Sequence, residues 1–270
     1  MPNPIVNTRT LFGGIVYDSL AVDYFTRAGI TDPNEKKVVN TFVLSCRGNT
    51  NIWTALQGGL VYLVSPTSYG ASLHNLMSSS FLANTTVAPA HSTNGWQPDG
   101  VTQFLKTGLI PSTTLTEDSH TTIIYSRTDV AVATSRIFGA IQGATTRING
   151  AVRGNTDLAV FSCYNSANAM VPASTNGSGY FTFTILSSTS RLIRRNGASL
   201  GTDATDISAS NRPNVEMYLL AQNNAGTMSA PAPYEVAGFI QTVTGLSTAD
   251  SDTLVTFLQT YNANIIAGGR

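Results

Sequence analysis

The sequence of 270 residues is poor in charge and has no long apolar run. Only 11% of its residues are charged, and fifteen basic residues balance fifteen acidic ones. Nucleic-acid binding usually needs a basic surface, so we expect no nucleic-acid partner. No apolar run approaches the roughly 18 residues that span a bilayer, so we expect no membrane insertion. A chain without net charge has little to keep copies apart, which favours a homo-oligomer.

Cysteine occurs only twice, at Cys46 and Cys163, without a paired spacing. We therefore expect two buried free thiols and neither a disulfide nor a metal site. The first ten residues, MPNPIVNTRT, lack the basic and apolar regions of a signal peptide. This predicts that the chain is made and folds in the cytoplasm.

Catalytic patterns are missing as well. A glycosidase needs two carboxylates facing each other across the sugar, about 5 to 5.5 Å apart in enzymes that retain configuration. Glu117 and Asp118 are adjacent and so point to opposite sides of an extended chain, while Glu216 and Glu235 each stand alone. Serine is abundant, so a Ser-His-Asp arrangement stays open, although no G-x-S-x-G turn occurs. The three histidines have no partner at a metal-ligand spacing: His74, His91 and His120. We expect no catalytic, metal or cofactor site.

The segment from Gly179 to Thr202 predicts consecutive antiparallel strands. Phe181, Phe183 and Ile185 alternate with polar residues, as in a strand buried on one face. Asn196-Gly197 can adopt positive φ at both central positions of a type I′ hairpin turn. Further short β segments follow the same pattern, bounded by glycine, asparagine and serine: residues 60–64, 121–126, 130–140, 158–163, 216–221 and 236–243. An all-β sandwich is the fold class that this layout favours.

Helical patterns occur at both ends of the chain. Residues 18–57 predict helices, one of them begun by Asp32, Pro33 and Glu35 in a capping-box order. Ser247 and Asp250 predict a second box near the C-terminus. The helix that follows carries an apolar stripe that needs burial: Leu254, Phe257, Leu258 and Tyr261. We expect neighbouring subunits to bury at least part of this stripe.

Several motifs carry a resemblance to a known family. In chain order they are DYFTRAGITDPNEKKVVNTFV, IWTALQGGLVYLVSP, the block Asn94, Gly95, Pro98, Asp99 and Gly100, YSRTD at 125–129, RRNG at 194–197, YLLAQNNAGTMSAP at 218–231 and GLS-x-x-D at 245–250. Together they resemble bacteriophage virion proteins that place a helical segment ahead of a concanavalin-A-like sandwich. The hairpin itself resembles laminin-G-like domains.

The resemblance implies a mainly β fold, an antiparallel two-sheet jelly roll with amphipathic helices at both ends. We expect an N-terminal arm and helical segment over residues 1–58, the jelly roll over 59–245 and a C-terminal helix over 246–270. It also implies a place in the virion, other virion proteins as partners and synthesis in a bacterial host. Laminin-G-like modules often hold calcium, for which the loose candidates are Asp157, Asp203 and Asp206, although aspartate in a turn explains each of them too.

A few residues are candidates for contact with a ligand or partner. Trp96 lies in a glycine-rich loop and either stacks on a sugar face or plugs the core. Asn223 and Asn224 offer amides to a glycan or shape a hairpin turn. The densest basic patch is read as a solvated strand face or a subunit contact, with an anionic glycan as the third alternative: Arg191, Arg194 and Arg195.

Our leading sequence-based interpretation is a non-enzymatic bacteriophage virion structural protein. It would be displayed on the particle as a capsid decoration, a head fibre or a tail-associated protein. The alternative is a carbohydrate-binding host-attachment module whose partner is a host surface glycan. A glycoside hydrolase ranks third because the carboxylate pair is missing.

Overall fold

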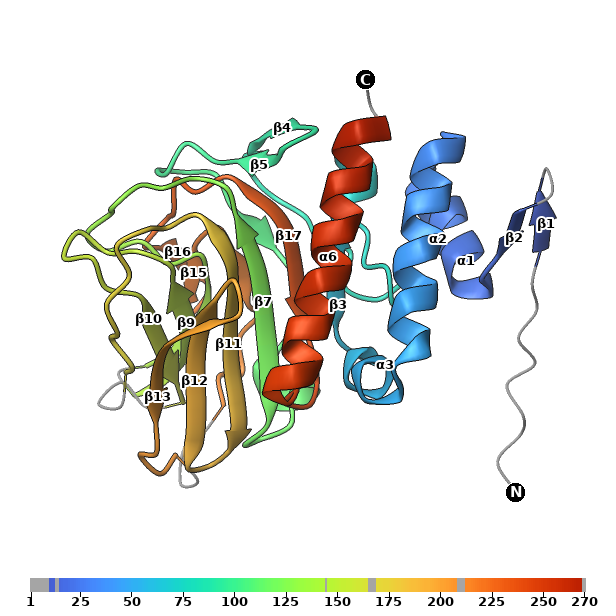
Figure 1. The fold of residues 1–270 in the computed structure, drawn as a ribbon. Coiled ribbons are helices and arrows are strands. Elements are labelled where there is room, and N and C mark those ends of the chain that lie inside the picture. The colour runs from blue at the N-terminus through green and yellow to red at the C-terminus, as the bar shows by residue number, and fades with distance from the viewer. Residues whose placement is uncertain (1–9, 13–14, 144, 165–168, 208–211, 269–270) are drawn as a thin grey trace.

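The computed structural model describes residues 10–12, 15–143, 145–164, 169–207 and 212–268. In this part of the chain, two stacked sheets form a sandwich, and a layer of helices covers one side of it (Figure 1). Outside the sandwich, β1 (Thr10–Phe12) pairs with β2 (Ile15–Tyr17) in a separate antiparallel sheet of two strands. None of the described helices is both long and apolar enough to cross a bilayer.

The larger sheet has the order β13-β12-β11-β7-β17-β5-β4, and β3 also pairs with β17. Its strands are β3 (Leu60–Leu63), β4 (Ala90–Ser92), β5 (Gly95–Gln97), β7 (His120–Ser126), β11 (Gly179–Ser187), β12 (Ser190–Arg195), β13 (Ala198–Asp203) and β17 (Val236–Gln241). The printed pairings in this sheet are all antiparallel.

The smaller sheet has the order β10-β9-β8-β14-β6, and β15 and β16 extend it beside β8. Its strands are β6 (Leu105–Lys106), β8 (Phe138–Gln142), β9 (Thr146–Ala151), β10 (Val160–Cys163), β14 (Tyr218–Leu219), β15 (Gln222–Asn224) and β16 (Thr227–Ser229). The β15–β8 pair is parallel, so this sheet is mixed. The fold is therefore mainly β with two sheets, as the sequence predicted, but the parallel β15–β8 pair corrects the expectation that both sheets are antiparallel.

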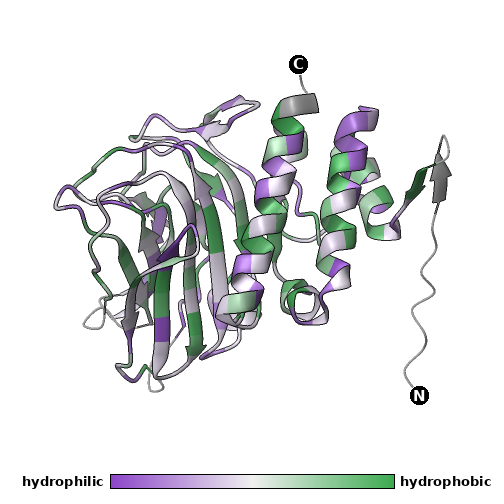
Figure 2. Cartoon of the chain, in the orientation of Figure 1, coloured by the Kyte–Doolittle hydropathy of each residue, from purple (hydrophilic) through white to green (hydrophobic). Residues whose placement is uncertain are grey.

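The helices are α1 (Ser19–Ala28), α2 (Pro33–Gly48), α3 (Thr50–Leu56), α4 (Tyr69–Ser72), α5 (Pro111–Thr114) and α6 (Thr248–Gly268). Figure 1 places α1, α2 and α6 together on the same side of the larger sheet. Figure 2 shows hydrophobic residues interleaved with hydrophilic ones along α2 and α6, as expected for helices with one buried side.

Two hydrophobic clusters hold the layers together. The first lies between the sheets and contains Phe181, Phe183 and Ile185, the residues that the alternation placed inside, together with Met217 and Leu219. The second lies between the larger sheet and the helices. Because of this second layer, the other face of β11 is buried as well: Thr184 is 0% exposed, and Tyr180 stacks on Tyr125 with ring centroids 4.0 Å apart. The expectation of a strand buried on one face alone was wrong, because the helices cover its polar side.

Local turn and cap chemistry agrees with the sequence. Asn196 and Gly197 have φ of 50° and 82°, which confirms the predicted hairpin turn. The Asp32 carboxylate accepts from the Glu35 backbone N–H at 2.7 Å. The Glu35 carboxylate does not complete that box, since it accepts from the Thr67 hydroxyl at 2.7 Å instead.

Two predicted strands differ most from their expected ranges. The segment over 130–140 becomes strand only at Phe138, because its earlier backbone groups bond to loops, as Arg136 N–H does to Ala230 O at 2.8 Å. The segment over 216–221 keeps only β14, since Leu220 has a φ of 68° and turns the chain.

The C-terminal stripe is buried within the chain itself. Leu254 and Leu258 are fully buried, and the Tyr261 hydroxyl donates to Val64 O at 2.9 Å. Phe257 is partly buried against the same cluster. Neighbouring subunits are therefore not needed to cover this stripe, which corrects the expectation that they would.

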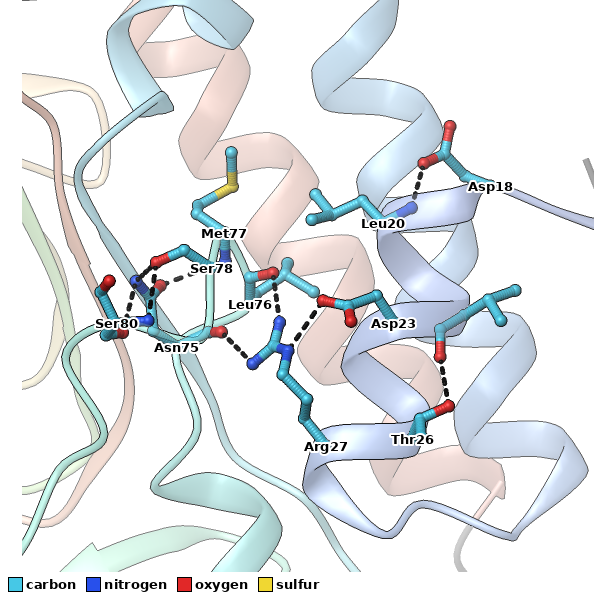
Figure 3. A network of polar contacts seen from close by, with 11 residues as sticks. Asp18, Leu20, Asp23, Thr26, Arg27, Asn75, Leu76, Met77, Ser78 and Ser80 are labelled. Carbon is cyan, nitrogen blue, oxygen red and sulfur yellow. Dashed lines mark hydrogen bonds and ion pairs between the residues drawn. The ribbon is translucent and has the colours of Figure 1, made fainter. Parts of the chain in front are cut away.

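A polar network fastens α1 to the loop that follows α4 (Figure 3). Arg27 pairs with Asp23 at 2.7 Å and donates to Asn75 O at 3.1 Å. The Asn75 side chain in turn accepts from Val61 N–H at 2.9 Å and donates to Gly59 O at 3.0 Å. One buried amide thus links the helix layer to the start of β3.

Candidate functional site

Trp96 is a core residue. It lies on β5 opposite Val236, is 0% exposed and belongs to the cluster between the sheets. A ring in this position cannot stack on an external sugar. The structure therefore corrects its assignment as a glycan contact and supports the alternative of a core plug.

Asn223 and Asn224 lie at the end of the β15–β16 hairpin. The Asn223 amide donates to Glu216 O at 2.9 Å and accepts from Gly226 N–H at 2.7 Å, so it shapes the turn. Asn224 is exposed. Side chains alternate along a strand, so Asn224 shares the face of Gln222.

The three arginines of β12 are used inside the chain. Arg191 is 1% exposed and forms an ion pair with Asp203. Arg194 points to the other face and pairs with Asp252 of α6. Arg195 donates to Asn176 O at 2.7 Å. Because they face different sides and bond within the chain, they do not form the single basic patch that the sequence suggested, and the structure gives no reason to place a subunit contact there.

No described residues form a ready catalytic or metal centre. Ser72 Oγ lies 3.0 Å from His91 Nε2, but Ser72 is fully buried and also accepts from Ser65 N–H at 2.8 Å. Among the residues that the structure describes, no group of three or more His, Cys, Asp or Glu side chains could hold a metal ion. Of the calcium candidates, Asp157 pairs with Arg153 at 2.8 Å and Asp203 with Arg191. Cys46 and Cys163 are free and buried, as predicted.

The outer face of the smaller sheet, opposite the core, carries a row of small and polar residues. We call it the outer polar row: Ser162, Asn149, Gly139, Gln222 and Ser229. Strand register creates it, because Ser162 pairs with Asn149, Asn149 with Gly139, and Gln222 with Ser229. Inward-facing neighbours such as Phe138, Ile148 and Phe161 belong to the core, so the row faces away from it.

Gly139 lets two amides converge at the centre of this row. A β-carbon at Gly139 would lie 2.7 Å from Asn149 Cβ and 2.9 Å from Gln222 Cβ, closer than side chains tolerate. The Asn149 amide donates to Gln222 Oε1 at 3.2 Å and accepts from Arg136 Nε at the same distance. At the end of the row, the buried Ser229 hydroxyl has no hydrogen-bond partner among the residues that the structure describes.

Two guanidinium groups flank the row. Arg136 also donates to Ser135 O at 2.9 Å, and Arg147 lies two residues before Asn149 on the same side of β9. Burial lowers the pKa of Arg136, and the charge of Arg147 lowers it further, which places the two cations near each other. The face thus combines amides, hydroxyls and positive charge, a set suited to a polar ligand rich in hydroxyls or carrying an anion.

Sequence reasoning missed this row. One available signal was the alternation of TRINGA in β9, in which Arg147 and Asn149 share the face that points away from the core. No local pattern indicated that Gln222, more than 70 residues away, would meet Asn149.

Comparisons with known proteins support the fold. No protein-family model matches the chain, and no curated protein matches its sequence. A mutant Trypanosoma rangeli sialidase is similar in structure, with a TM-score of 0.57 and 12% identity over 84% of this chain and 39% of the sialidase. The chain therefore spans about two fifths of that protein.

Two further structures are similar at the same level. Domain 4 of AbnA, a GH43 extracellular arabinanase from Geobacillus stearothermophilus solved with arabinotriose, has a TM-score of 0.51 and 10% identity over 73% of this chain and 97% of that domain. A structure of botulinum neurotoxin type C, whose cell entry depends on two ganglioside molecules, has a TM-score of 0.50 and 10% identity over 74% of this chain and 51% of the toxin chain. At these identities the likeness concerns the fold.

Proposed function

We propose that the protein is a carbohydrate-binding module with a concanavalin-A-like jelly roll, and that the outer polar row is its sugar-binding surface. The observation that carries the proposal is the hydrogen-bonded chain from Arg136 through Asn149 to Gln222 on a sheet face turned away from the core. Sugar hydroxyls both donate and accept, and side-chain amides provide both functions in one plane.

The geometry of the row supports this role. Asn149 is 1% exposed and held at both ends of its amide, so it positions its neighbours. Gln222 is only partly buried and can offer its amide to a ligand. Asn224 would add an exposed amide from the same hairpin.

The structural neighbours fit a binding module. The arabinanase domain is matched over 97% of its own length by 73% of this chain, and it was solved with an oligosaccharide. The toxin structure concerns recognition of gangliosides. The sialidase likeness allows a glycosidase-like fold, but we propose binding without turnover, because the isolated carboxylates are engaged singly: Glu235 pairs with Arg127 at 3.4 Å, and Glu216 accepts from Gly108 N–H at 3.2 Å.

The sequence motifs extend the proposal to a biological setting. On their resemblance alone, we propose that the module is part of a bacteriophage particle and helps it attach to a host surface glycan. We also propose that the chain forms a homo-oligomer, because a chain without net charge has little to keep copies apart. Labelling intact particles with an antibody against this chain under the electron microscope tests the setting separately from sugar binding.

A glycan array with the purified chain tests the proposed function. We expect binding to a defined set of glycans, and a loss of about tenfold or more for Gln222→Ala, the usual effect of removing a hydrogen bond from a ligand contact. Gln259→Ala is the matched control, since Gln259 is an exposed glutamine on α6 in the helix layer. Failure of every glycan to bind, or equal losses in the two variants, would reject the outer polar row as a sugar site.

A further inference from the structure

We infer that the glycan bound at the outer polar row carries a carboxylate, which Arg136 holds beside Arg147. The inference rests on the proposed function and names the class of sugar: an acidic saccharide such as a uronic or sialic acid. It follows from the charge around Arg136.

Arg136 is a partly buried cation that lacks an anionic partner. Other arginines of the chain form ion pairs with carboxylates, at positions 27, 47, 127, 153, 191 and 194. Arg136 has none among the described residues, and the partners it does have are neutral oxygens, Asn149 Oδ1 and Ser135 O.

The surroundings of Arg136 make this arrangement unfavourable without a ligand. Partial burial removes water from the guanidinium, and the nearby Arg147 adds repulsion, so that both effects lower the pKa of Arg136. A ligand carboxylate would supply the missing counter-charge. Its two oxygens also match the planar fork of a guanidinium, which forms short, charge-assisted hydrogen bonds.

The neighbours of Arg136 fit the remainder of a sugar acid. Asn149 is held by Arg136 and in turn positions Gln222, whose partly buried amide would meet ring hydroxyls while the carboxylate stays at the arginine. A neutral sugar could use the amides alone and would leave the charge of Arg136 unpaired. The outer polar row therefore distinguishes acidic from neutral sugars by charge, whereas its amides would bind both kinds of sugar.

Paired probes test the inference. On the array, each acidic glycan is compared with its neutral counterpart: 3′-sialyllactose with lactose, and an oligogalacturonide with the same chain after methyl esterification. We expect the acidic member to bind at least about tenfold more tightly, as loss of a charge-assisted contact predicts. Binding of the acidic member should also weaken as NaCl rises.

Variants separate the charge of Arg136 from its structural role. Arg136→Gln can still donate to Asn149 but has no charge, so we expect this variant to bind an acidic glycan and its neutral counterpart about equally. Lys37→Gln, at an exposed position on α2, removes the same charge elsewhere and should keep the preference. A thermal melt of each variant confirms folding.

The outcomes distinguish the two proposals. Binding of neutral glycans with equal strength, or an unchanged preference in Arg136→Gln, overturns the acidic-sugar inference and leaves the sugar site in place. Loss of acidic and neutral binding together in a folded Arg136→Gln variant means that Arg136 only positions Asn149, which also overturns it. Absence of any glycan binding rejects the proposed function and the inference with it.

Discussion

His120 should make the protein lose stability in mild acid. The residue lies on β7, is 0% exposed, and its Nε2 atom is 2.7 Å from the Tyr164 hydroxyl. Burial, and then the charge of Arg212, lowers the pKa of His120 to about 3. In the unfolded chain the pKa returns to about 6.5. Below that pH the unfolded chain binds a proton that the folded chain excludes, so acid favours unfolding.

The size of the effect follows from the two pKa values. The stabilising contribution of neutral His120 is fully present above pH 6.5 and falls by about 1.4 kcal/mol for each pH unit between about 6.5 and 3. Between pH 7.5 and pH 4.5, the free energy of unfolding should therefore fall by about 3 kcal/mol from this residue. Carboxylates contribute mostly below that window, so the histidine effect can be separated from theirs.

Urea unfolding at a series of pH values measures this loss. His120→Gln can still bond to Tyr164 but does not titrate. Between pH 7.5 and pH 4.5, the free energy of unfolding of this variant should therefore fall by about 3 kcal/mol less than that of the wild type. His74→Gln is the control, because His74 is only partly buried and its pKa is lowered less strongly by burial and by Arg27. A difference of less than about 1 kcal/mol between wild type and His120→Gln, or a His120 imidazole NMR signal that titrates near pH 6.5, would refute the reasoning.

Other predictions concern the core, the turn and the helix cap. Phe183→Ala should cost about 3–5 kcal/mol in denaturant unfolding, because Phe183 is fully buried between the sheets, and a loss below 1 kcal/mol would contradict that. Gly197→Val should lower the melting temperature, since valine is strained at a φ of 82°; an unchanged melt would argue against the turn. Asp32→Ala should cost about 1 kcal/mol by removing the cap of α2, whereas Asp32→Asn should retain most of it, as unfolding of the two variants would show.

Features governed by neighbouring residues were predictable from the sequence. The alternation of Phe181, Phe183 and Ile185 identified the inner face of β11, and Asn196-Gly197 identified its hairpin turn. Asp32 identified the start of α2. In each case, strand geometry, positive φ or a local hydrogen bond determines the structure, and all of these act over a few residues.

Features that depend on long-range packing were not predictable in the same way. Trp96 stands in a glycine-rich stretch that suggested an exposed loop, yet pairing of β5 with β17 places it in the core. The three arginines of β12 are close in sequence but do not share one face, so that Arg194 pairs with Asp252 of α6. The outer polar row depends on the register of strands distant in sequence, and that register is set only when the sandwich forms.

Side-chain amide NMR gives the most direct test of the claim that the outer polar row binds carbohydrate. The chain, labelled with nitrogen-15, is titrated with the strongest glycan from the array, and the side-chain amide signals are followed. We expect saturable shifts at the amides of Asn149 and Gln222, with none at Gln259 on α6. Saturable shifts confined to residues away from the row, or no saturable shift at all, would contradict it.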